Sequence, residues 1–242
     1  MQRLLPLYYK KKYNMKRFAF ITLLCMLQGV AVAQLSVGVH GGLTLTGVER
    51  SQAGRIDETY ENLKGFDAGI DGSYAFNSWF SLRAQLDVMQ RNHRMQRHLN
   101  YIKPVYTNHV NTYLTLPLMA DFSFGTQRLR GHLLVGGYGA YWLNHRIKGT
   151  TYGMTDYEVF FNQFDEKSPF SSSDRRVDFG TVAGVGLSYG ITDYIDLSLN
   201  AMCYYSLLSY RKGYPALNDY RYLNTASFTF GISYIIPQTE QQ

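Results

Sequence analysis

Hydrophobic and polar residues alternate with a period of two along most of this chain. In the segment 194–210 (YIDLSLNAMCYYSLLSY), mainly apolar side chains from Ile195 to Leu207 occupy the odd positions, and mostly polar ones from Asp196 to Ser206 occupy the even positions. The pattern predicts a β-strand with one apolar and one polar face. The segment is much longer than an ordinary strand of about 5–6 residues.

The same alternation recurs and predicts eight strands. They span residues 35–48, 65–76, 79–91, 110–122, 130–143, 176–189, 194–210 and 222–236. Most of them reach the length of about 9–11 residues that a tilted barrel strand needs to cross a bilayer. Charged and small polar residues fall opposite the apolar face, as is typical of transmembrane barrels.

The connections between these strands alternate between short and long. The short ones are 77–78, 123–129 and 190–193, and the long ones are 49–64, 92–109, 144–175 and 211–221. Outer-membrane barrels have short periplasmic turns and longer external loops. We therefore predict an all-β fold, an eight-stranded antiparallel up-and-down transmembrane β-barrel, rather than a soluble sandwich.

This topology assigns the two faces of each strand. The odd face of 194–210, with Cys203, is expected to contact lipid, and the even face is expected to point into the lumen. Aromatic residues near the strand ends are expected to form the two interfacial girdles. They are Phe76, Trp79, Phe80, Tyr141, Trp142, Tyr189 and Tyr194.

Residues 1–33 have the character of a leader. The run MKRFAFITLLCMLQGVAVAQ begins at Met15, our expected start, with a basic pair, an apolar stretch and a small-residue end at Ala33. This is typical of a cleavable signal peptide. An uncleaved anchor is the alternative, but the apolar run is shorter than the roughly 20 residues needed to span a membrane. We expect the barrel domain to occupy residues 34–242.

The net charge of +6 belongs to this leader. The leader holds six of the 24 basic residues and none of the 18 acidic ones, so the remainder is neutral. No basic stripe is left to follow phosphates, and we expect no nucleic-acid partner. Cys203 is the one cysteine beyond the leader, which excludes an internal disulfide and a cysteine-based metal cluster.

The histidines show no catalytic spacing. None of His40, His93, His98, His109, His132 and His145 forms a His-x-x-x-His or His-x-Ser motif. His93 and His98 are expected to be solvated at the rim of a loop. The sequence therefore predicts no enzyme activity and no catalytic, cofactor or metal site.

Charged residues of both signs are predicted to face the lumen. They are Asp67, Asp71, Arg83, Asp87, Arg91, Arg130, Asp178 and Asp196. An eight-stranded barrel is about wide enough for side chains to fill it, and unpaired charges there are costly. We expect pairs such as Asp71 with Arg83 or Arg91 to form a plug. The alternative is a thin ion path.

The longest connection carries exposed aromatic candidates. The segment 157–170 (YEVFFNQFDEKSPF) contains Tyr157, Phe160, Phe161, Phe164 and Phe170 beside two acids. These residues are expected to form either an external interaction surface or a lid over the barrel mouth.

Several segments resemble a known family. They are a leader that ends in Ala-Gln, VGVHGGLTLTG (37–47), YLTLPLMADFSFG (113–125) and LLVGGYGAYWL (133–143). They are similar to the small outer-membrane β-barrel proteins of Bacteroidota, described as PorT-like or porin-family proteins with an outer membrane protein beta-barrel domain. The resemblance covers residues 35–236, and its most specific part is YLTLPL, which places Pro117 within a strand. It implies an eight-stranded barrel in the outer membrane of a Gram-negative cell. One relative acts in protein secretion, but no residue here assigns that role.

Together these features predict an exported, non-enzymatic integral outer-membrane protein. Its expected role is structural, surface interaction, or secretion and envelope assembly. A narrow porin-like diffusion channel is the alternative, and an enzyme acting on lipid or peptide is a third hypothesis. Expected partners are outer-membrane lipid and envelope or secretion proteins. The sequence does not define an oligomeric state.

Overall fold

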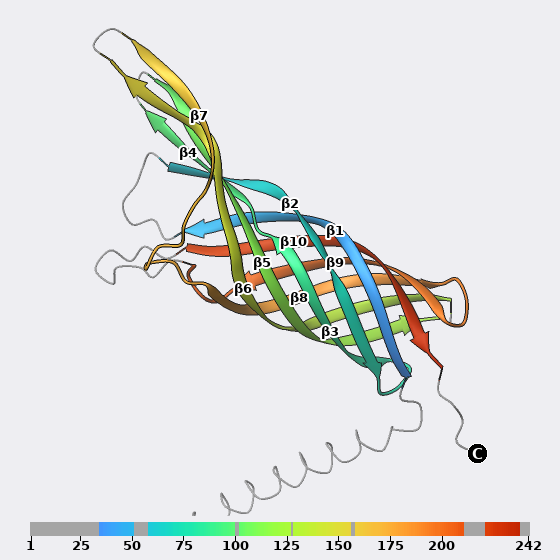
Figure 1. Cartoon of the computed structure of the whole chain (residues 1–242). Helices are drawn as coiled ribbons and strands as arrows, with labels where there is room; N and C mark the ends of the chain where they lie inside the picture. Colours follow the sequence, from blue (N-terminus) through green and yellow to red (C-terminus); the bar gives the residue numbers. More distant parts are fainter. Residues whose placement is uncertain are drawn as a thin grey trace, which may run out of the picture.

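A single closed antiparallel sheet forms the body of the molecule in the computed structural model (Figure 1). The structure describes residues 34–50, 58–99, 102–126, 128–155, 158–210 and 221–237. Within them the strands are β1 (Gln34–Arg50), β2 (Glu58–Ala75), β3 (Phe80–Gln90), β4 (His93–Leu99), β5 (Ile102–Gly125), β6 (Leu129–Met154), β7 (Val159–Lys167), β8 (Val177–Gly190), β9 (Ile195–Ser206) and β10 (Arg221–Ile236). The predicted leader lies outside the described residues.

Eight of these strands make the ring. Its order is β1-β2-β3-β5-β6-β8-β9-β10, with every neighbouring pair antiparallel. Pairing of β1 with β10, from Leu35 with Ile236 to Arg50 with Arg221, closes it. The predicted eight-stranded up-and-down barrel is therefore confirmed. No helix in the described part of the chain is long and apolar enough to cross a membrane.

The side chains alternate as predicted between the outside and the lumen. In β9, Ile195, Leu199 and Cys203 are exposed, whereas Asp196 and Asn200 are buried. Exposed large aliphatic and aromatic residues recur on every ring strand and form the apolar band. Aromatic rings gather at the short-turn end, where Trp79 stacks on Phe122 with ring centroids 6.2 Å apart. This is the arrangement of an interfacial girdle.

The short turns have local causes in the sequence. In the β2–β3 turn, Asn77 Oδ1 accepts hydrogen bonds from the backbone N–H groups of Trp79 (3.0 Å) and Phe80 (2.7 Å). Such an Asx turn mimics a backbone turn and helps to reverse the chain. The β5–β6 turn begins at Gly125, whose φ of 129° is accessible to glycine.

Pro117 lies at a gap in the ladder. The β3–β5 pairing runs from Phe80 with Phe122 to Ala84 with Leu118 and resumes at Asp87 with Thr115. Proline has no backbone N–H to donate, which accounts for the interruption on this side of β5. On its other side Pro117 is opposite Tyr138 of β6.

Three predicted loops are in fact largely strands, and the first of them, 49–64, contains the end of β1 and the start of β2. Residues 92–109 contain β4 and the start of β5, and residues 144–175 contain the end of β6 and all of β7. Strand β4 pairs with β2 and β5, and β7 pairs with β6, so the sheet continues beyond the ring. Figure 1 shows this extension rising on one side of the barrel.

The extension begins where the alternation changes phase. Thr112 is opposite Asn144 but Tyr113 is opposite Trp142, so Leu143 is an extra residue in β6. Such a bulge bends a strand and re-aims its side chains. Trp142, just before the bulge, lies on the same inward-facing parity as Tyr138 and Ala140 and is buried, so its prediction as a girdle residue is wrong.

Candidate functional site in the barrel lumen

A buried ion pair crosses the lumen near the ends of β3 and β8 that are remote from the short turns. Arg91 follows the last residue of β3 and is fully buried, and its Nη1 lies 2.8 Å from Asp178 Oδ2 on β8. Asp178 also accepts hydrogen bonds from the hydroxyls of Tyr138 (2.9 Å) and Ser206 (2.5 Å). A buried charge pair needs such additional hydrogen bonds to offset desolvation.

Tyrosine rings surround the Arg91 guanidinium. Its carbon lies 5.1 Å from the ring centroid of Tyr113, 4.8 Å from that of Tyr138 and 5.8 Å from that of Tyr204. Cation–π contacts of this kind become stronger in a site shielded from water. The guanidinium is therefore held by rings as well as by its ion pair.

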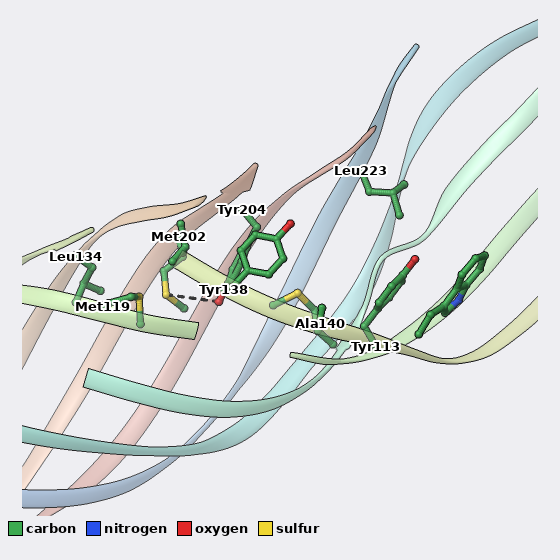
Figure 2. Packing of buried hydrophobic residues seen from close by; sticks show 11 residues of the cluster. Tyr113, Met119, Leu134, Tyr138, Ala140, Met202, Tyr204 and Leu223 are labelled. Atoms are coloured by element: carbon green, nitrogen blue, oxygen red, sulfur yellow. Dashed lines mark hydrogen bonds between the residues drawn. The ribbon is translucent and has the colours of Figure 1, made fainter. Parts of the chain in front are cut away.

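Apolar side chains continue this packing along the barrel axis. Figure 2 shows Met119 and Leu134 at one end of the row, Tyr138, Met202 and Tyr204 in the middle, and Tyr113 and Leu223 toward the other end. They come from four ring strands, β5, β6, β9 and β10, and are almost completely buried. The row supports the expectation of a plugged lumen, with tyrosine and apolar side chains contributing as much as the charges.

A second charged network lines the short-turn half of the lumen. Asp121 accepts from Arg83 Nη2 at 2.9 Å and contacts His132 Nδ1 at 2.9 Å, while His132 Nε2 lies 2.8 Å from Ser188 Oγ. Arg130 and Asp196 pair at 2.6 Å. These residues border a cavity of about 750 Å³ that reaches the short turns at Asn77 and Thr126.

Three further carboxylates meet on the β1–β3 wall. His40 Nδ1 lies 3.4 Å from Asp71 Oδ1, and His40 Nε2 lies 3.1 Å from Asp87 Oδ1. Asp67 completes the group, and Ser227 donates a 2.5 Å hydrogen bond to its Oδ2. Gly69 is opposite both His40 and Asp87, and a Cβ at this position would meet Asp87 Oδ1 at 2.3 Å.

All eight residues of the predicted charge cluster lie on the lumen face, but they divide into three groups. Arg91 pairs with Asp178, Arg130 pairs with Asp196, and Asp67, Asp71 and Asp87 gather around His40. The expected pairing of Asp71 with Arg83 or Arg91 is wrong, because Arg83 pairs with Asp121 instead. Sequence reasoning missed His40, Asp121 and His132, although strand parity places them on the polar face.

Three histidines stack where the extension leaves the ring. The ring centroids of His93 and His109 are 4.7 Å apart, those of His109 and His145 are 5.4 Å apart, and His109 Nδ1 lies 3.1 Å from His145 Nε2. His93 is buried, so its expected solvation is wrong; nothing is described of the His98 side chain. Burial, and then the neighbouring positive groups His109, His145 and Arg221, lower the pKa of His93 well below its ordinary value.

The aromatic candidates of the external segment separate into two places. Phe160 and Phe161 are 42% and 43% exposed on β7, which Figure 1 shows rising away from the barrel, and Phe164 is half-buried on the same strand. Phe170 packs edge-on against Trp142, with ring centroids 5.1 Å apart, near the barrel mouth. Tyr157 lies outside the described residues.

A ring of eight antiparallel strands with an apolar outer band and a polar interior defines a transmembrane β-barrel protein. The model of the family described as "Outer membrane protein beta-barrel domain" matches residues 28–210, and the chain belongs to this family. It is therefore an integral protein of the outer membrane, with lipid around its apolar band.

Solved structures of other small barrels resemble the chain in fold. OprG from Pseudomonas aeruginosa is 12% identical over 84% of this chain and 96% of its own, with a TM-score of 0.47. Outer membrane protein W from E. coli is 12% identical over 85% of this chain and 100% of its own, with a TM-score of 0.44. Ail from Yersinia pestis is 13% identical over 83% of this chain and 98% of its own, with a TM-score of 0.39. No curated protein matches this chain.

Proposed function

We propose that the protein is a non-enzymatic barrel that acts at the cell surface, through contacts of its external sheet extension with another protein. The lumen plug around Arg91 supports a structural role for the ring. The β6–β7 hairpin, residues 146–167, is the part that supports an interaction role. We also propose that YLTLPL places the chain in the PorT-like branch and that a signal peptide is cleaved after Ala33.

One observation carries this proposal: large apolar residues are exposed at the far end of the hairpin. They are Tyr152, Met154, Val159, Phe160 and Phe161, and Met154 is 67% exposed. They lie at the paired end of β6 and β7, where Met154 is opposite Val159. Apolar groups beyond the lipid band have no membrane to cover them, and such patches mark interaction sites.

The hairpin also has a free strand edge. Strand β7 ends the sheet order and, among the described strands, pairs with β6 alone. An exposed edge accepts an added strand from a partner through main-chain hydrogen bonds, while side-chain pockets give specificity. The exposed edge and the aromatic tip together favour an extended, partly apolar segment of a partner protein.

Site-specific photo-crosslinking on intact cells tests this role. A photoreactive residue at Phe161 is compared with one at Ile191, which lies in the opposite, short-turn end of the barrel. We expect one discrete protein adduct from position 161, lost on Phe160→Ser and absent from position 191. Equal labelling from both positions, or an adduct at 161 unaffected by Phe160→Ser, would overturn the proposal.

A shortened hairpin provides the matched control for folding. Lys148 is opposite Asp165, so residues 149–164 can be replaced by an Asn-Gly turn that preserves the ion pairs of Asp165 with Arg146 and Lys148. We expect this variant to form a heat-modifiable barrel without the adduct. Loss of the barrel itself would place the hairpin in the folding core instead.

A narrow diffusion channel is the second candidate function, supported by the charged cavity of the short-turn half. Planar-bilayer conductance of the purified protein separates it from the first. A plugged lumen predicts a folded barrel without current steps. Discrete, reproducible steps would favour the channel, with Arg83, Asp87 and Arg91 as the residues that determine its selectivity.

A further inference from the structure

We infer that His40, Asp67 and Asp87 form a binding site for one divalent transition-metal ion inside the barrel lumen, with Asp71 as the residue that orients His40. One ligand atom from each of His40, Asp67 and Asp87 lies within 4.8 Å of the others, and all three residues are buried. Imidazole and carboxylate together form a donor set that suits Zn²⁺ and similar ions.

The two ring nitrogens of His40 have different surroundings. Nδ1 is directed to Asp71 Oδ1 at 3.4 Å, and Nε2 is directed to Asp87 Oδ1 at 3.1 Å. Metal-binding histidines commonly donate the proton of one nitrogen to a carboxylate, which fixes the tautomer and presents the other nitrogen to the metal. With the proton on Nδ1, Nε2 presents a lone pair to the oxygens of Asp67 and Asp87.

Four buried ligand atoms of this group have no hydrogen-bond partner. Asp87 has no exposed surface, and neither of its oxygens accepts a hydrogen bond; Asp67 Oδ1 and His40 Nε2 are also buried without one. Buried polar atoms are ordinarily satisfied, and a carboxylate without a partner is costly. A cation among these atoms would satisfy them together.

The charges of the neighbouring residues also favour a bound cation. Asp121, Asp178 and Asp196 each pair with an arginine, whereas Asp67, Asp71 and Asp87 have no lysine or arginine partner in the described chain. Protonation of His40 would compensate one of the three carboxylates and leave two. A divalent ion bound to Asp67 and Asp87 compensates both, while the neutral imidazole supplies its Nε2 and the N–H that Asp71 accepts.

The backbone leaves room for the group and the lumen gives access to it. His40 is flanked on the neighbouring strands by Gly69 and Gly231, and Asp67 is opposite Gly42. Asp71 also lines the cavity that reaches the short-turn end. An ion from that side of the membrane reaches the group past Asp71, and water from the cavity supplies a further ligand to a site with three protein ligands.

The test uses the whole protein purified from outer membranes, treated with a chelator and then titrated with Zn²⁺. We expect one equivalent of zinc per chain and an X-ray absorption spectrum with nitrogen and oxygen neighbours at about 2.0–2.2 Å and no sulfur. His40→Gln and Asp87→Asn should each abolish stoichiometric binding. Asp71→Asn should retain one equivalent but lose about 10–100-fold in affinity, because it orients a ligand without being one.

Asp196→Asn is the matched control. It removes another buried lumen carboxylate, whose partner is Arg130, and zinc binding should be unchanged. A heat-dependent gel shift of each variant verifies the barrel. A folded wild-type protein without stoichiometric zinc would overturn the inference and leave a proton bridging His40 and the acids. Equal zinc binding by the wild type and a folded Asp87→Asn variant, or equal loss in Asp196→Asn, would overturn it as well.

Discussion

Arg91 Nη1 and Asp178 Oδ2 meet at 2.8 Å in the lumen although 87 residues separate them in sequence. Arg91 follows β3 and Asp178 lies at the start of β8, and these strands are not neighbours in the ring. The pair therefore fixes strands that share no ladder. This contact across the lumen therefore contributes to the closed shape of the barrel.

Replacing one partner of this ion pair should destabilise the barrel more than replacing both partners. Arg91→Met leaves Asp178 buried and unpaired, and we expect it to lower the free energy of unfolding by about 3–5 kcal/mol. The double variant Arg91→Met/Asp178→Leu should recover much of this loss. Urea unfolding of the barrel in lipid vesicles measures both.

The exposed Arg146–Asp165 pair is the control for this comparison. Arg146 Nε lies 2.6 Å from Asp165 Oδ1, but both side chains are solvated. Arg146→Met should leave the unfolding free energy nearly unchanged, since water replaces the contact. If Arg91→Met behaves in the same way, the lumen pair is not structural.

A charged side chain on the lipid-facing surface should destabilise the barrel more near the middle of the membrane than near its edge. Leu199 is exposed near the middle of β9, so Leu199→Arg should destabilise the barrel by about 2–4 kcal/mol. Ile191→Arg, in the turn between β8 and β9, should cost about 0–1 kcal/mol. Refolding yields and unfolding titrations of the two variants give the comparison, and equal costs would argue against this placement of the membrane.

Alanine substitutions at two glycines of β2 should have very different effects on the free energy of unfolding. A Cβ at Gly69 would meet Asp87 Oδ1 at 2.3 Å and the carbonyl oxygen of Leu86 at 2.5 Å, whereas at Gly72 the nearest atom, Ser36 O, is 3.9 Å away. Gly69→Ala should cost about 1–3 kcal/mol through overpacking, and Gly72→Ala should be tolerated. Unfolding free energies of the pair test this; a tolerated Gly69→Ala would contradict the close approach of Asp87.

Stability should fall in mild acid because of His93. Burial lowers the pKa of His93 well below its ordinary value of about 6.5, so the folded protein keeps this ring neutral while the unfolded chain binds a proton there. Below pH of about 6.5 the unfolded state is therefore favoured, by up to about 1.4 kcal/mol per pH unit from this one group.

His93→Phe removes this titration and preserves a ring against His109, which lies opposite on β5. Urea unfolding at pH 7.5 and at pH 5.5 should show a smaller loss of stability for the variant than for the wild type. Identical pH dependence of the two proteins would mean that His93 takes up a proton in the folded state as easily as in the unfolded chain.

The ring could be predicted from the sequence because lipid and lumen impose opposite demands on successive residues. In β9, for example, the apolar Leu199 is exposed on the outside and the polar Asn200 is buried in the lumen. The extension could not be predicted in this way, because its strands, such as HRMQRHL (93–99), have no continuous apolar face. His93 was misassigned because it was expected in a loop, and Trp142 because an aromatic residue near a strand end is typical of a girdle.

The lumen residues were predictable as a set, but their partners were not. Parity places Asp71 and Arg83 on the inner face, yet the strand register and side-chain reach bring Arg83 to Asp121 and Asp71 to His40. The tyrosines around Arg91 were missed because an aromatic ring at a strand position is as compatible with lipid as with a plug. Only the register and the burial of Tyr113, Tyr138 and Tyr204 distinguish the two.

Strand β6 runs without interruption from the short turn at Leu129 to the hairpin tip at Met154. Its 26 residues extend over about 86 Å at about 3.3 Å per residue, nearly three times the hydrocarbon thickness of about 30 Å. A pull on the tip is therefore carried along one strand into the wall, where the ladders to β5 and β8 resist it in shear. In the proposed interaction role, the barrel therefore serves as the mechanical anchor of the hairpin.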